Sequence, residues 1–74
     1  MTKWFLNTFL PSFKEGDTQI TEKQYNVFVS NLKGKEFIDG YISGYMKTVN
    51  GYKLKVYSWQ TVNGTRYYIE KEKA

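Results

Sequence analysis

The clearest structural signal lies in FIDGYISGYMKTVNGYKLKVYSWQTVNGTRYYIEK, residues 37–71. This segment contains two Asn-Gly dipeptides, Asn50-Gly51 and Asn63-Gly64, and each separates two runs in which apolar and polar residues alternate. Asn-Gly is a strong hairpin signal, because a two-residue type I′ turn requires positive φ at both central positions. Two such turns in series predict a three-stranded antiparallel meander, with strands near residues 36–49, 52–62 and 65–71.

The same turns assign each strand residue to one of two faces. Two-residue loops would pair Val49 with Tyr52 and Val62 with Thr65, and successive strand side chains point to opposite faces. The face expected to be buried carries Tyr41, Tyr45, Val49, Tyr52, Leu54, Val56, Val62, Tyr67 and Ile69. The other face is expected to carry Ile42, Met46, Lys53, Lys55, Tyr57, Trp59, Thr61, Arg66, Tyr68 and Glu70, with Trp59 opposite Tyr68.

A helix is predicted over residues 22–33. Thr21 and Gln24 form the two ends of a capping box, which marks a helix N-terminus. Apolar residues follow at the spacing of one helical face, and Gly34 is the expected stop signal. The apolar stripe consists of Tyr25, Phe28, Val29 and Leu32. This helix should lie across the buried face of the meander.

The remaining segments have weaker patterns. Residues 2–10 have apolar residues at i,i+4 and suit a short helix, but their Trp, Phe and Thr content also favours a strand. Residues 11–19 are interpreted as a polar linker, with Phe13 as a core anchor, and residues 70–74 as a fraying tail. Gly40 and Gly44, within the first predicted strand, indicate a bulge, a bend or a close approach of the helix.

These elements predict one small α+β domain over residues 1–74. One or two N-terminal helices would precede the three-stranded antiparallel β-meander, with a helix packed on one face of the sheet. A chain of 74 residues is near the lower size at which a domain folds alone, although 41% of its residues are hydrophobic.

Composition limits the chemistry. The chain contains no cysteine and no histidine, which excludes disulfides and the ligands that most zinc sites use. We therefore expect no metal and no cofactor. The first ten residues lack a signal-peptide cleavage site and are too short to span a bilayer, so we expect a cytoplasmic protein without a membrane partner.

Nothing in the sequence predicts catalysis. Proton transfer near neutral pH uses histidine or carboxylates of shifted pKa, and the close pair Glu36 and Asp39 would point to opposite faces of an extended segment. The serines and threonines lack a base that could activate them. Gly34-Lys35 lacks the glycine spacing of a phosphate-binding loop. We expect a non-catalytic binding module.

The second face suggests what such a module binds. The candidate binding residues are Lys53, Lys55, Tyr57, Trp59, Arg66 and Tyr68. Aromatic rings on a sheet can stack with bases while cations contact phosphates, and the formal net charge is +4. The leading hypothesis is therefore binding of single-stranded nucleic acid or RNA.

Three alternatives stay open. The apolar N-terminal segment, with Trp4, Phe5 and Phe9, could cover this face and complete a two-sided core. Aromatic pairs across strands could serve only to stabilise a hairpin. The third alternative is a protein-interaction module that docks on an acidic protein surface, since Tyr and Trp are enriched at interface hot spots. A phage or other mobile element could encode such a module as an inhibitor or adaptor of a host protein.

Overall fold

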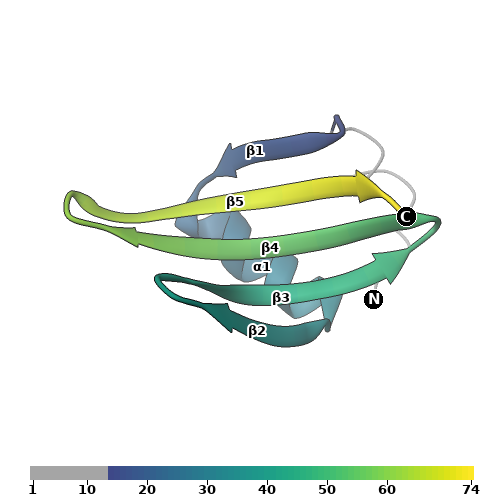
Figure 1. The fold of residues 1–74 in the computed structure, drawn as a ribbon, viewed down its shortest axis with the longest axis horizontal. Coiled ribbons are helices and arrows are strands. Elements are labelled where there is room, and N and C mark those ends of the chain that lie inside the picture. The colour runs from purple at the N-terminus through teal and green to yellow at the C-terminus, as the bar shows by residue number, and fades with distance from the viewer. Residues whose placement is uncertain (1–13) are drawn as a thin grey trace.

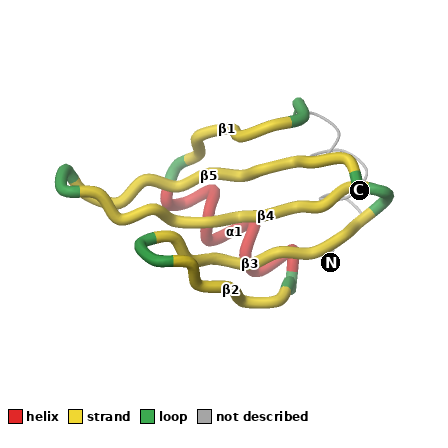
Figure 2. The backbone as a smooth tube through the Cα atoms, in the orientation of Figure 1, coloured by secondary structure: helices red, strands yellow, loops and turns green. Residues whose placement is uncertain are grey.

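The computed structural model describes residues 14–74, which form one helix and five strands (Figure 1). In chain order the elements are β1 (Gly16–Ile20), α1 (Glu22–Leu32), β2 (Lys35–Asp39), β3 (Ile42–Val49), β4 (Tyr52–Thr61) and β5 (Gly64–Lys73). The strands form a single antiparallel sheet in the order β1-β5-β4-β3-β2. Figure 2 shows α1 crossing one face of this sheet behind β5, β4 and β3.

The hydrophobic core lies between α1 and the sheet. Phe28 and Leu32 of the helix are 1% and 0% exposed. They pack against Ile20, Leu54, Val56 and Ile69 from three different strands. Tyr25, Val29, Tyr45, Val49, Tyr52 and Tyr67 surround this cluster and are partly buried. The core therefore uses one face of the sheet, and we call it the helix-covered face.

Local sequence explains where α1 begins and ends. The predicted capping box is confirmed: the Thr21 hydroxyl accepts from the Gln24 amide at 3.1 Å, and the Thr21 amide donates to the Gln24 side chain at 2.9 Å. At the other end Lys33, not Gly34, adopts the left-handed conformation (φ 49°, ψ 44°). Gly34 has another function, because a Cβ there would collide with the backbone carbonyl of Met46.

The predicted three-stranded meander is wrong in the number of strands. Residues 16–20, interpreted as linker, form β1 and pair with β5, from Gly16 opposite Lys71 to Ile20 opposite Tyr67. The long first strand is two strands, β2 and β3, joined by the two-residue turn Gly40-Tyr41. Gly40 has φ 62°, and glycine at the first central position is typical of a type II′ hairpin turn.

The two Asn-Gly dipeptides form different turns. The first is confirmed: Val49 pairs with Tyr52, and Asn50 and Gly51 have φ of 51° and 81°, as a type I′ turn requires. The second is wrong, because Thr61 pairs with Gly64 and the central residues are Val62 and Asn63. Only Gly64 has positive φ there, 119°.

The shifted turn moves every β4–β5 pair by two residues. Trp59 therefore lies opposite Arg66, not Tyr68, and Tyr57 lies opposite Tyr68. A shift of two preserves the face of each side chain, since strand side chains alternate with a period of two. The predicted tail also differs, because β5 continues to Lys73 and the Ala74 amide donates to the Gly51 carbonyl at 2.9 Å.

The remaining predictions concern residues in turns and residues outside the described range. Tyr41 and Val62, expected on the buried face, are 77% and 100% exposed because both lie in turns. The predicted helix or strand over residues 2–10, the anchor Phe13 and a possible cover by Trp4, Phe5 and Phe9 all lie outside the described residues. Within residues 14–74, no helix has the length and apolar character needed to cross a membrane.

Candidate functional site

The second face of the sheet is the candidate site, and we call it the open face. Its members follow from the strand register, since opposite residues share a face. It carries Asp17, Gln19, Lys35, Phe37, Asp39, Ile42, Gly44, Met46, Thr48, Lys53, Lys55, Tyr57, Trp59, Thr61, Arg66, Tyr68, Glu70 and Glu72. The helix α1 lies on the opposite side of the sheet (Figure 1).

Three aromatic side chains from β4 and β5 lie together on this face. Tyr57 and Tyr68 stack across the two strands with ring centroids 5.3 Å apart and an interplanar angle of 22°. Trp59 tilts against Tyr68 at 6.5 Å and 42°, and it is 42% exposed. The two stacked tyrosine rings therefore cover one face of each other.

A fourth aromatic ring extends this group toward the β2 edge. Phe37 shares a row across the sheet with Gly44, Tyr57 and Tyr68. The Lys55 ammonium lies 5.4 Å from the Phe37 ring centroid, within the range of a cation–π contact.

Gly44 lies between the rings of this row because its backbone lies directly against that of β4. A Cβ there would meet the Val56 carbonyl oxygen and the Tyr57 Cα. The predicted close approach at Gly44 is therefore to β4, not to the helix.

Charge on the open face is balanced between the two signs. Two lysines of β4 lie opposite two glutamates of β5: Lys53 opposite Glu72, and Lys55 opposite Glu70. Among residues 14–74, the cations of this face are Lys35, Lys53, Lys55 and Arg66, and its carboxylates are Asp17, Asp39, Glu70 and Glu72. The described residues of the open face therefore carry no net charge.

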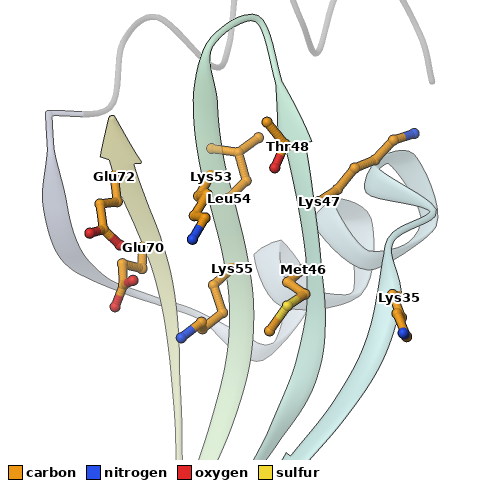
Figure 3. A pocket seen from close by; sticks show the side chains of 9 residues that line it. All are labelled: Lys35, Met46, Lys47, Thr48, Lys53, Leu54, Lys55, Glu70 and Glu72. Atoms are coloured by element: carbon orange, nitrogen blue, oxygen red, sulfur yellow. The ribbon is translucent and has the colours of Figure 1, made fainter. Parts of the chain in front are cut away.

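A hollow of about 350 Å³ is lined by residues of β2, β3, β4 and β5 (Figure 3). In the figure the glutamates of β5 lie on one side of the lysines of β4, and Met46 and Thr48 of β3 lie on the other. The lining residues are Lys35, Met46, Lys47, Thr48, Lys53, Leu54, Lys55, Glu70 and Glu72. Its walls thus offer hydrogen-bond donors, acceptors and two apolar residues, Met46 and Leu54, which suits a ligand surface that is partly polar and partly apolar.

Burial and nearby carboxylates raise the pKa of two groups on the open face, Tyr57 and Glu70. Burial, reinforced by the charges of Asp17 and Glu70, raises the pKa of Tyr57 to about 12. Burial, a hydrogen bond with Asp17 and the charges of Asp17 and Glu72 raise the pKa of Glu70, while Lys55 lowers it. The Tyr57 phenol stays protonated at neutral pH, and its hydroxyl hydrogen-bonds to the Asp17 carboxylate.

The structure places all six predicted site residues, Lys53, Lys55, Tyr57, Trp59, Arg66 and Tyr68, on one face. Ring contacts join the three aromatic ones. Sequence reasoning missed Asp17, Lys35 and Phe37, because it interpreted their segments as a linker and as part of one long strand. The short alternating run Gly16–Ile20 was the available signal for β1.

Comparison with known proteins adds no relationship: no family model matches the chain, and neither the curated proteins nor the solved structures contain a match. The open face is therefore the feature from which a function can be inferred. Among residues 14–74, no group of three or more Asp or Glu side chains is placed to hold a metal ion.

Proposed function

We propose that this protein is a non-catalytic binding module that recognises another protein through its open face. The observation that supports this most directly is the combination of the exposed Trp59, which lies against the half-buried Tyr57–Tyr68 pair, with balanced charge. Tyr and Trp are the residues most enriched at protein-binding hot spots. Paired rows of lysines and glutamates supply the complementary charge that orients a protein partner.

The same arrangement favours a protein partner over single-stranded nucleic acid or RNA. A site for nucleic acid needs net positive charge along the path of the phosphates. Here each lysine of β4 has a glutamate opposite it on β5. Bases also need open ring surface, and the stacking of Tyr57 on Tyr68 covers one face of each ring. An inhibitor or adaptor of a host protein needs only a contact surface of this kind.

The test combines capture of the partner with nucleic-acid titration. Tagged protein is used to capture partners from a lysate of its native host, with and without nuclease, and labelled oligopyrimidine DNA and RNA are titrated at two salt concentrations. We expect capture that nuclease does not affect. Replacing Trp59 with Ala should weaken capture by about 2 kcal/mol, or roughly thirtyfold, if that ring is a central hot spot.

Two matched controls make the result specific. Val27→Ala removes an apolar side chain of similar exposure, 40%, from the outer surface of α1, and it should leave capture unchanged. Lys23→Ala removes an exposed lysine of α1, on the other side of the sheet from the open face. If Lys53→Ala and Lys55→Ala weaken oligonucleotide binding and Lys23→Ala does not, the open face would instead be assigned to nucleic acid.

A further inference from the structure

The outer edge of β2 offers a second interaction surface, separate from the open face. β2 is the last strand of the sheet, and within residues 14–74 no strand pairs with its outer side (Figure 1). Its Ile38 side chain is 75% exposed. An uncovered edge strand presents unpaired N–H and C=O groups, and these can pair with a strand of another chain.

The turn at Gly40-Tyr41 determines which backbone groups face outward. In a two-residue turn the residues on either side, here Asp39 and Ile42, form the hydrogen-bonded pair. Hydrogen-bonded and non-hydrogen-bonded pairs then alternate along the ladder. Asp39, Phe37 and Lys35 therefore direct their backbone groups toward β3. Glu36 and Ile38 direct theirs outward.

The sequence of β2 is complementary to itself when two copies run antiparallel. Centred on Phe37, the pairing places Lys35 opposite Asp39 of the second copy, and Asp39 opposite its Lys35. Glu36 then lies opposite Ile38, so the outward backbone groups of one copy meet those of the other. The register that pairs opposite charges is therefore also the register in which the outward backbone groups can hydrogen-bond.

The other edge of the sheet lacks this property. An antiparallel pair of β1 strands centred on Thr18 would place Asp17 opposite Gln19, with no opposite charges. β1 also begins at Gly16, whose φ of 101° departs from strand geometry. Edge pairing through β2 is therefore more specific than pairing through β1.

We propose that two copies of this chain associate through their β2 strands, antiparallel and in register at Phe37, to form one continuous ten-stranded sheet. Both open faces would then lie on the same side of the extended sheet. The contact is a short strand pair, well below the size of a permanent interface, so the dimer should form in a concentration-dependent way.

A single introduced cysteine tests the register. The chain has no cysteine, so Phe37→Cys creates its only thiol. In the proposed dimer the two copies of residue 37 form a non-hydrogen-bonded pair, with Cα atoms about 4.5 Å apart, which a disulfide can span. We expect Phe37→Cys to form an intermolecular disulfide faster than Val62→Cys, although Val62 is fully exposed. Equal rates would contradict the proposal.

Charge exchange tests the same register without cysteine chemistry. Asp39→Lys should weaken self-association, measured by sedimentation, and the exchange Lys35→Asp with Asp39→Lys should restore it. Two opposite-charge pairs correspond to a change in association of about two- to thirtyfold. Ile38→Pro removes an outward N–H, as edge strands tolerate, and should give a folded monomer. A wild-type chain that stays monomeric at the highest concentration, or a charge exchange that fails to restore association, would overturn the proposal.

Discussion

The two faces of the sheet use the same strands for different purposes. On the helix-covered face, Leu54, Val56 and Ile69 are at most 1% exposed and contact α1 side chains. On the open face, Trp59 is 42% and Met46 is 38% exposed. Stability should therefore depend on the first face, and recognition on the second.

The largest effect should come from the helix-covered face. Phe28→Ala removes a side chain that is 1% exposed and leaves a cavity in a small core, which should cost about 3–5 kcal/mol of unfolding free energy. Chemical denaturation measures this loss, and complete unfolding would agree with it. As the control from the open face, Trp59→Ala should cost less than about 1 kcal/mol, the scale of one cross-strand pair. Comparable losses in the two variants would remove the proposed division between the faces.

Gly44 is a position on the open face where, as in the core, a substitution should destabilise the protein. A Cβ there would collide with the β4 backbone at Val56 and Tyr57, and backbone cannot move aside as a flexible side chain can. We expect Gly44→Ala to cost about 1–3 kcal/mol, typical of overpacking. Thr48→Ala, on the same strand and face but exposed, is the control. A Gly44→Ala protein as stable as wild type would show that β3 can separate from β4 at this point.

The smallest effect concerns the carboxylates of the open face. Because the folded state raises the pKa of Glu70 above its usual value of 4.5, folding favours its protonated form. This contribution to stability is complete below pH 4.5 and is lost as the pH rises through the raised pKa. Glu70→Gln should remove that part of the pH dependence and raise stability at neutral pH.

Urea denaturation at several pH values between about 4 and 7 measures this difference. Glu36→Gln, a change on the helix-covered face, is the control and should leave the pH dependence of the wild type in place. A Glu70→Gln variant whose urea midpoint follows the wild-type pH dependence would contradict the assignment to Glu70.

The sequence predicted which face of the sheet each candidate side chain occupies, but not which residues lie beside it. Alternation along β4 placed Lys53, Lys55, Tyr57 and Trp59 together on one face. The pairing of Trp59 was wrong because Asn63 does not adopt positive φ, so the turn moved by one residue and the register by two. The acidic partner on β1, Asp17, was not predictable, because it lies far from Glu70 in the chain and becomes its neighbour only through the β1–β5 pairing.

The sequence by itself determined the local features of this protein. The capping box at Thr21, the type I′ turn at Asn50-Gly51 and the alternation along β4 and β5 depend on residues close in the chain, and local hydrogen bonds and sterics are sufficient to specify them. Only the tertiary structure decided which strands form the edges and which charges lie opposite one another. Those features depend on pairing between distant segments, where burial of the shared core selects one arrangement among several that satisfy the local preferences equally.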